Sequence, residues 1–393
     1  MKKIAIIAEG FGGSTTSLIE SFLKNGYQID FYHIARRNNY SGSYETFDYT
    51  CTSRVGELKR IESFDFKGLR RFKDFAHKEL FSMYHMIALS IKTKGIKQIF
   101  NPISKFFCKK LVNQIISKNY DFINVIGQSW TTAYISKQLH DRRMNIAHSL
   151  HEVCSNHLEG NKLDPVCVFL INEKIKINVF SEKSACDLTK LSPQKGLQYS
   201  IIPFSLFTGY LEYKDIVIPE LFGVEDYILF YGFLKEYKGL DVLYKASQHL
   251  NKKIVIAGGG YVHVLDDMKK DNRFIVINRW LQNAEISTLI RHCHVVVCPY
   301  YSSSQTGITQ TVFCFNKPII ATRVPAFITS IDNQKTGILV DIGDDKQLTN
   351  AINQTFTDKS LYDLMCKNIK KIKERKDDLW KKIVIMYVNE YLK

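Results

Sequence analysis

Apolar and polar residues follow two periods along the chain. Short apolar runs predict buried strands, and apolar residues every three or four positions predict helices. In the first half, strands are predicted at residues 3–8, 27–34, 122–126, 145–150, 178–181 and 199–202, and helices at 15–25 and 131–139. In the second half, strands are predicted at 227–231, 253–257, 274–277, 294–299, 318–322 and 337–340, and helices at 239–250, 284–292, 305–315 and 345–356. This alternation is typical of parallel, doubly wound α/β sheets.

The alternation occurs twice, which predicts two Rossmann-like domains. The pattern weakens between Pro203 and Glu225 and restarts near Tyr227. We therefore expect domains at residues 1–210 and 211–375. Residues 376–393 are expected to form a C-terminal helix that packs back toward the first domain. Two such domains would form a cleft at the carboxyl ends of their strands.

A glycine cluster follows the first predicted strand and opens the first helix. Gly10, Gly12 and Gly13 would let the backbone approach a ligand, and a helix N-terminus attracts anions. The spacing is not G-x-G-x-x-G, and no acidic residue stands cleanly at the end of the second strand, which disfavours a nicotinamide cofactor. The alternative is a tight strand-to-helix turn.

Two histidines lie at the carboxyl end of the strand predicted at 145–150. His148 and His151 have a spacing that resembles a metal pair, but only His157 follows as a further ligand. A histidine at this end of a strand is a candidate for the active site, although most single histidines are structural.

The second half contains two further strand-to-helix loops with candidate chemistry. Gly232 is followed by Lys235 and Lys238 at a helix start, where cations are normally avoided, so this loop predicts a diphosphate-binding site. Ser304, Gln305, Thr306 and Gly307 offer hydroxyls, an amide and a close-approach glycine for a sugar or a phosphate. Simple N-capping by Ser304 is the alternative.

Charge is unevenly distributed over the 393 residues, whose formal net charge is +15. Residues 54–118 contain fifteen Lys or Arg but only five Asp or Glu, interleaved with phenylalanines. This pattern suits an anionic membrane surface or a lipid phosphate, or a solvated basic face. Nucleic acid is not expected as a partner, because no nucleic-acid-binding module is recognisable.

The remaining composition indicates a cytoplasmic protein. The apolar stretch 83–91 is far shorter than the roughly 20 residues of a membrane span, and the apolar run at the start is too short for a signal peptide. Nine cysteines without a C-x-x-C pair fit reduced thiols rather than disulfides or zinc ligands.

Taken together, these motifs resemble a known family. The chain looks like a retaining glycosyltransferase of the two-domain GT-B architecture, in the large family that builds capsules, lipopolysaccharides and glycolipids. The similarity is best from Tyr227 to Val340, where the segments that match the family's order and spacing are 228–232, 237–240, 297–300, 305–307, 316–322 and 336–340. Gln305-Thr306-Gly307 resembles the subgroup with Gln-Ser-Gly in this loop.

The resemblance implies transfer of a sugar from a nucleotide diphosphate sugar to a hydroxyl of a glycan or lipid-linked acceptor. It implies catalytic roles for His151 and Lys238, and donor binding by Gly232, Lys235, Lys238 and residues 304–307. It also implies that Gly10, Gly12 and Gly13 form an acceptor-side loop. The chain has no D-x-D triplet, so no metal or other cofactor is expected.

Two departures from the family pattern keep other functions open. Phe233 stands where the family often has arginine. The family's first glutamate would fall near Ser302 or Ser303 and its second at Thr311, so both carboxylates are absent. An impaired, sugar-binding partner subunit of another transferase and a nucleotide-sugar epimerase on the same fold are the main alternatives. A basic lipid-binding protein without catalysis is a third.

Overall fold

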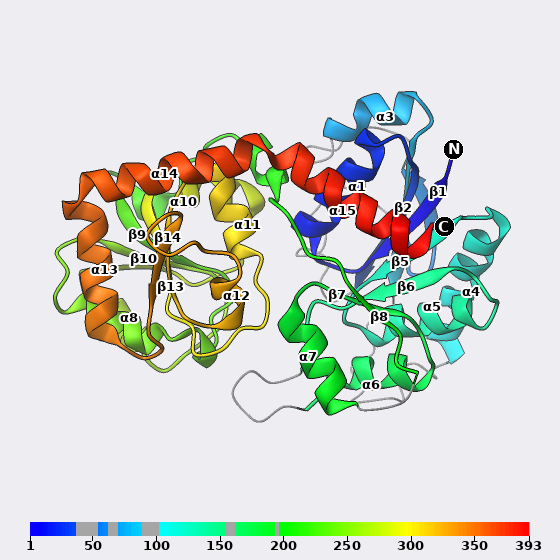
Figure 1. Cartoon of the computed structure of the whole chain (residues 1–393), viewed down its shortest axis with the longest axis horizontal. Helices are drawn as coiled ribbons and strands as arrows, with labels where there is room; N and C mark the ends of the chain where they lie inside the picture. The colour runs from blue at the N-terminus through cyan, green and yellow to red at the C-terminus, as the bar shows by residue number, and fades with distance from the viewer. Residues whose placement is uncertain (37–53, 62–69, 89–101, 155–161, 193–195, 393) are drawn as a thin grey trace. The chain divides into compact units, whose positions relative to one another are not determined.

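The computed structural model describes residues 1–36, 54–61, 70–88, 102–154, 162–192 and 196–392. These residues form two compact α/β units (Figure 1). The first unit comprises the described residues up to Ser205 together with those from Asp377 onward, and the second comprises Leu206–Lys376.

The first unit is built on a sheet that has eight strands among the described residues. Its order is β3-β4-β2-β1-β5-β6-β7-β8, and only β3 runs antiparallel to its neighbour. The strands are β1 (Lys3–Ala8), β2 (Gln28–Arg36), β3 (Leu58–Ile61), β4 (Phe81–Ala88), β5 (Phe122–Ile126), β6 (Ile146–Ser149), β7 (Ile177–Val179) and β8 (Tyr199–Ile201). Helices on both sides make the central strands fully buried, which explains the unbroken apolar runs in β1 and β5.

The helices of this unit connect successive strands, and a C-terminal helix returns to the sheet. They are α1 (Gly12–Lys24), α3 (Lys73–His77), α4 (Pro102–Ser117), α5 (Trp130–His140), α6 (Pro165–Asn172), α7 (Glu182–Leu191) and α15 (Lys376–Tyr391). The ring of Tyr391 on α15 stacks on Phe122 of β5, with ring centroids 4.4 Å apart. Asn145 donates a hydrogen bond of 2.6 Å to the carbonyl oxygen of Tyr391, so the end of α15 is fixed on this unit.

The second unit contains a parallel sheet of six strands among the described residues. Its order is β11-β10-β9-β12-β13-β14. The strands are β9 (Tyr227–Tyr231), β10 (Ile254–Ala257), β11 (Phe274–Ile277), β12 (Cys293–Cys298), β13 (Ile319–Thr322) and β14 (Gly337–Val340). The helices are α8 (Leu240–Ser247), α9 (Leu265–Lys270), α10 (Asn283–His292), α11 (Ile308–Val312), α12 (Pro325–Ile328), α13 (Asp345–Thr357) and α14 (Lys359–Glu374).

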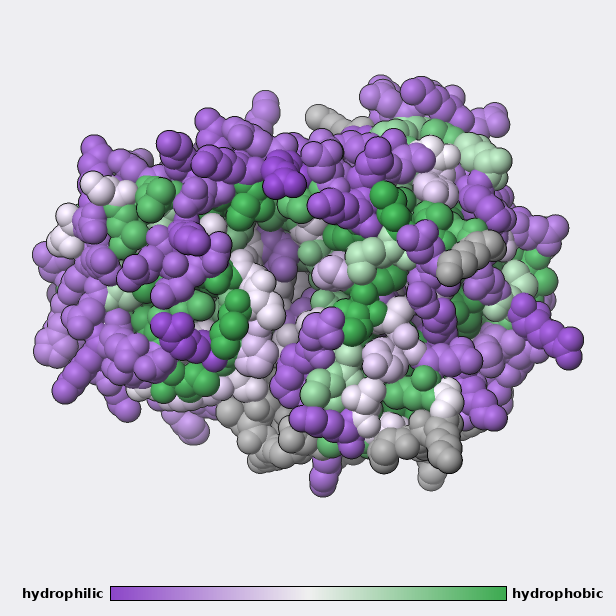
Figure 2. Space-filling model, viewed as in Figure 1, coloured by the Kyte–Doolittle hydropathy of each residue, from purple (hydrophilic) through white to green (hydrophobic). Residues whose placement is uncertain are grey.

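Helix α14 shows how these helices divide between core and solvent. Its buried side chains are Met365 and Ile369, four positions apart and therefore on one face. Figure 2 shows hydrophilic residues along the outer surface of this helix. In the described part of the chain, no helix combines the length and the apolar composition that a bilayer crossing requires.

The predicted fold class is confirmed, and most predicted strands lie within one residue of their observed positions. The main omission is β4, which pairs with β2 over its whole length. Ser82 and His85 interrupt its apolar run, so the sequence did not indicate a buried strand, yet His85 is fully buried in the sheet.

Candidate functional site

The strand order of the second sheet reverses at β9, which pairs with β10 on one side and β12 on the other. Ligands of parallel α/β sheets bind at the carboxyl ends of the strands at such a reversal, because the two following loops diverge there. The loop after β9 contains Gly232, Lys235 and Lys238, and the loop after β12 runs from Pro299 to Gly307. The two predicted donor loops are therefore neighbours in space.

Direct contacts join these two loops. The amide of Tyr301 donates a hydrogen bond of 2.7 Å to the carbonyl oxygen of Tyr237, and its hydroxyl donates one of 2.6 Å to Asp241 on α8. Gly239 has φ 67°, and a Cβ on it would lie 2.0 Å from the carbonyl oxygen of Pro299. Only glycine permits this approach, so the loops form one rigid edge.

The two lysines of the first loop occupy different environments. Lys238 is only 8% exposed, and its Nζ lies 5.3 Å from the centroid of the Tyr300 ring. Lys235 is exposed, with its Nζ 5.7 Å from the ring centroid of Phe233. Both residues precede α8, whose first residue is Leu240. Lys238 is therefore the cation held at the junction of the loops.

Gly232 provides the space beside Lys238. Its φ is 112°, and a Cβ there would lie 3.2 Å from the Nζ of Lys238. Behind it, a Cβ on Gly258 would lie 2.1 Å from the carbonyl oxygen of Gly232. The glycines after β9 and β10 thus let two backbones meet without side chains, next to the ammonium group.

The loop after β12 differs from its prediction at the helix start. The helix predicted from Gln305 begins at Ile308. Before it, the Ile308 amide donates a hydrogen bond of 3.2 Å to Thr306 Oγ1, and Ser303 Oγ donates one of 2.9 Å to the carbonyl oxygen of Gln305. The N-cap is Gly307, with no side-chain cap from Ser304, so the N-capping alternative is wrong. A Cβ on Gly307 would lie 2.8 Å from the Phe207 ring.

The glycine cluster of the first unit forms the start of α1. The helix begins at Gly12, its N-cap is Phe11 with φ 56°, and no acidic residue lies in its first turn. Gly10 has φ 78°, although a Cβ there would meet nothing within 4 Å. Gly10 and Gly12 thus flank a phenylalanine held in the left-handed region, which the sequence did not reveal.

His151 lies in an aromatic stack beyond the end of β6. Its ring is parallel to that of Phe11 with centroids 3.6 Å apart, and the rings of Phe180 and Phe204 lie at 4.9 Å and 5.2 Å. Burial lowers the pKa of His151 to about 3, so the imidazole is neutral near pH 7. Its Nε2 has no hydrogen-bond partner within the described residues. This nitrogen is therefore a buried polar atom without a partner in the described part of the chain.

His148, by contrast, is a structural residue inside β6. It is fully buried; its Nδ1 lies 2.8 Å from Ser136 Oγ and its Nε2 lies 3.0 Å from the carbonyl oxygen of Gly127. Because both nitrogens are hydrogen-bonded, the pair with His151 does not fit a metal site. Among the described residues no group of three potential metal ligands occurs, and His157 lies outside them.

The sequence missed the aromatic residues that shape both places. Phe11, Phe180 and Phe204 surround His151, and Tyr300 underlies Lys238. The only signal was their position at or just after the ends of predicted strands. Hydrophobic periodicity assigns such residues to the core, and only the structure shows that these rings contact the candidate polar groups.

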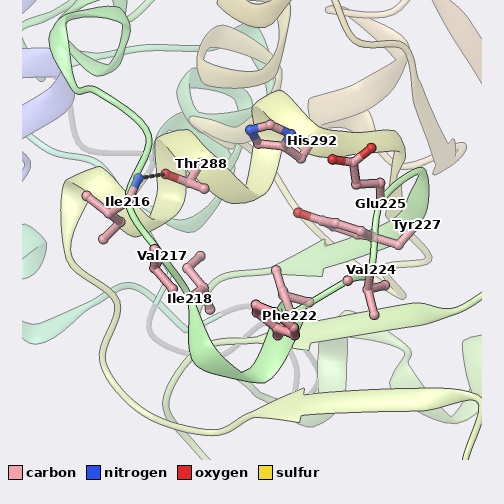
Figure 3. Close-up of a pocket in the computed structure, with 11 residues that line it drawn as sticks. Ile216, Val217, Ile218, Phe222, Val224, Glu225, Tyr227, Thr288 and His292 are labelled. Carbon is pink, nitrogen blue, oxygen red and sulfur yellow. Dashed lines mark hydrogen bonds between the residues drawn. The ribbon is translucent and has the colours of Figure 1, made fainter.

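A separate pocket of about 400 Å³ lies at the opposite, amino-terminal end of β9. Figure 3 shows Ile216, Val217 and Phe222 around it, with the Ile216 amide donating to Thr288 Oγ1 at 3.1 Å. The residues of this pocket are distinct from every predicted site residue.

Residues 225–358 match the family model described as glycosyl transferases group 1. This match covers both loops that carry the lysines and the Gln305-Thr306-Gly307 segment. The chain is a glycosyltransferase. No curated protein sequence matches the enzyme.

Solved structures share the two-domain GT-B fold of the enzyme. A sucrose-phosphate synthase of Thermosynechococcus elongatus has 14% identity and a TM-score of 0.66, with 100% of this chain and 99% of that chain covered. Anabaena HepE in complex with UDP and glucose has 12% identity and a TM-score of 0.67, with coverage of 99% and 100%. A glycosyltransferase of Rickettsia africae has 14% identity and a TM-score of 0.63, with coverage of 100% and 99%.

The close approach of the two loops predicts a large cost for one alanine substitution. Gly239→Ala should lower the free energy of unfolding by roughly 2–4 kcal/mol, because the new Cβ meets a backbone oxygen and the φ is left-handed. Urea unfolding of the purified enzyme measures this change.

Gly343→Ala is the matched control, because Gly343 has φ 79° and the nearest atom to its Cβ site is 3.9 Å away. This variant should cost only about 1 kcal/mol, from backbone strain alone. Equal losses in the two variants would show that the loops can separate without penalty.

Proposed function

We propose that the enzyme transfers a sugar, with retention at the anomeric carbon, from a nucleotide diphosphate sugar to a hydroxyl of a glycan or lipid-linked acceptor. The observation that carries this proposal is the buried lysine, Lys238, at the strand reversal of the matched domain. The similar HepE structure holds UDP and glucose, which supports a nucleotide-sugar donor.

The chemistry of the proposed reaction requires positive charge at the leaving diphosphate. The bond between the anomeric carbon and the phosphate oxygen breaks, the acceptor oxygen bonds to the same face, and the acceptor proton passes to the diphosphate. Lys238 would stabilise the developing charge from a largely desolvated position, where electrostatic interactions are stronger than in water. Lys235, at the exposed rim, would make a weaker contact.

The same lysines support a donor site that does not depend on a metal. A metal-bridged diphosphate is commonly held by acidic triplets, and the sequence contains no D-x-D. We infer that the charge of the two lysines replaces the metal. Gly232, Ser304, Gln305, Thr306 and Gly307 would line the donor, and Gly10, Gly12 and Gly13 would face the acceptor.

His151 would act as a neutral hydrogen-bonding group toward the donor sugar. Its lowered pKa, about 3, excludes a positive charge at neutral pH, so it would not serve as an acid. The unpartnered Nε2 would bind a sugar hydroxyl and the aromatic stack would fix the ring plane. This role positions the sugar and leaves the proton transfer to the substrates.

A donor screen tests the function directly. Nucleoside diphosphate release should be measured for UDP-, GDP- and ADP-sugars, with and without lipid-linked acceptors. We expect release with one donor.

His151→Ala should lower turnover at least tenfold, while the affinity for nucleoside diphosphate stays constant. The loss of turnover should be the same at pH 5.5 and at pH 8, because the imidazole is neutral at both pH values.

His148→Gln serves as the comparison for His151→Ala, since it alters a buried histidine inside β6, three residues away, that is not part of the aromatic stack. If only the His148 variant loses turnover, the assignment of the sugar contact to His151 is wrong. Donor binding without release from any donor would instead indicate a sugar-binding partner subunit, and an altered sugar without transfer would indicate an epimerase.

The different burial of the two lysines predicts an order of effects on donor affinity. Lys238→Ala should weaken UDP binding by about 10- to 150-fold, which corresponds to losing a charge-assisted contact of roughly 1.5–3 kcal/mol. Lys235→Ala should have a smaller effect, because exposed charges are screened by water and salt. Calorimetric titration measures both, and unchanged affinity in both variants would remove the diphosphate from this loop.

We also propose that the basic segment 54–118 places the enzyme on an anionic membrane surface, at its cytoplasmic face. Much of the segment, including Phe64, Phe66 and Phe100, lies outside the described residues. In the described part, Phe72 and Phe81 belong to the core, whereas Phe106 on α4 is 71% exposed. Lys109 and Lys110 are exposed near it, so α4 supports the proposal with one apolar and two cationic side chains.

Vesicle sedimentation tests the membrane proposal. The enzyme should bind anionic but not neutral vesicles, and high salt should release it, because each surface cation contributes roughly 1 kcal/mol that is screened within about 8–10 Å. Charge reversal at Lys109 and Lys110 should reduce binding. The same reversal at Lys381 and Lys382, exposed on α15, is the control. Recovery in the supernatant under all conditions would leave the segment as a solvated face.

A further inference from the structure

We propose that Tyr300 is a positioning residue that holds the ammonium group of Lys238 on the face of its ring. The inference rests on the proposed function for the identity of the ligand, but its geometry stands independently. Tyr300 follows β12 and Lys238 follows β9, so the contact joins the two loops of the site.

The contact has the distance and the burial of a strong cation–π interaction. The Nζ of Lys238 lies 5.3 Å from the centroid of the Tyr300 ring, inside the limit of about 6 Å for such pairs. Tyr300 is 2% exposed and Lys238 is 8% exposed. Because water is largely excluded from both groups, the attraction between charge and ring is weakly screened.

The Tyr300 ring is fixed by its own neighbours. It packs at 5.3 Å against Phe327 on α12 and at 6.0 Å against Tyr237, both edge-to-face. Its carbonyl oxygen accepts a hydrogen bond of 2.5 Å from Thr322 at the end of β13. A ring held by β13, α12 and the first loop cannot move away from Lys238 without disturbing the sheet edge.

The aromatic face, rather than the hydroxyl, carries the interaction. The hydroxyl oxygen of Tyr300 is buried without a hydrogen bond of normal geometry. Phenylalanine at this position would therefore keep the whole contact with Lys238. The neutral ring also orients the ammonium group without adding a formal negative charge to the site.

The first test is a double-mutant cycle on UDP affinity, measured by calorimetry. Tyr300→Leu should weaken UDP binding about 5- to 30-fold, and Tyr300→Phe should restore it. In a Lys238→Met background, Tyr300→Leu should change affinity less than twofold, because the cation that the ring holds is absent. Tyr227→Leu, at the opposite end of β9, is the control for a buried tyrosine lost from the same sheet.

The second test observes the contact without a nucleotide. In enzyme labelled with lysine at ¹³Cε, the Lys238 signal, assigned by its loss in Lys238→Met, should be displaced by the ring current of Tyr300. It should keep this displacement in Tyr300→Phe and lose it in Tyr300→Leu. A Lys238 signal at the position of solvent-exposed lysines in the unaltered enzyme would overturn the proposal even if Tyr300→Leu fails to fold.

The outcomes separate this inference from the proposed function. If Lys238→Met leaves UDP affinity unchanged while the displaced signal is present, Tyr300 holds Lys238 but the donor assignment is wrong. If Tyr300→Leu weakens UDP binding equally with and without Lys238, the ring has only a structural role and the inference is wrong. Failure of Tyr300→Phe to restore affinity would overturn it as well.

Discussion

The site in the second unit depends on one steric constraint, which is the contact of Gly239 with the carbonyl oxygen of Pro299. A Cβ at Gly239 would lie 2.0 Å from that oxygen, so the loops after β9 and β12 approach as closely as two backbones can. The strand reversal would otherwise leave a gap between diverging loops. Here the contact between Gly239 and Pro299 joins the two loops, and Lys238 beside it is only 8% exposed.

Burial of a lysine is costly unless its surroundings compensate for the lost hydration. At this site the compensation includes a polarisable ring beside Lys238, and the glycine at 232 leaves room for the ammonium group. A charge in a desolvated position interacts more strongly with an incoming anion than a hydrated charge does. The first unit provides the complementary case, since burial there makes His151 neutral. One unit thus presents fixed positive charge and the other an uncharged hydrogen-bonding ring.

Much of the fold could be predicted from the sequence, because periodicity reports burial and the parallel strands are buried on both faces. Prediction failed where burial and polarity disagree. β4 was missed because buried His85 interrupts its apolar run. The helix expected from Gln305 begins only at Ile308, and its N-cap is Gly307 rather than Ser304, the alternative that the sequence had left open. Lys235 and Lys238 were both predicted to bind the donor. Their difference in exposure depends on a 3-10 turn (Glu236–Lys238) that their spacing alone does not reveal.

The aromatic partners were beyond the reach of sequence reasoning for a related reason. A phenylalanine or tyrosine after a strand usually completes a core, and the chain contains 25 Phe and 21 Tyr, so most of them do. What distinguishes Phe11 and Tyr300 is which polar side chain each ring faces, and that is decided by contacts between segments distant in sequence. Phe11 reaches His151 because α1 starts with a left-handed residue, and Tyr300 reaches Lys238 because β9 and β12 are neighbours. In both places the backbone geometry, set by glycines and strand order, brings a ring to a polar group and so determines how that group can act.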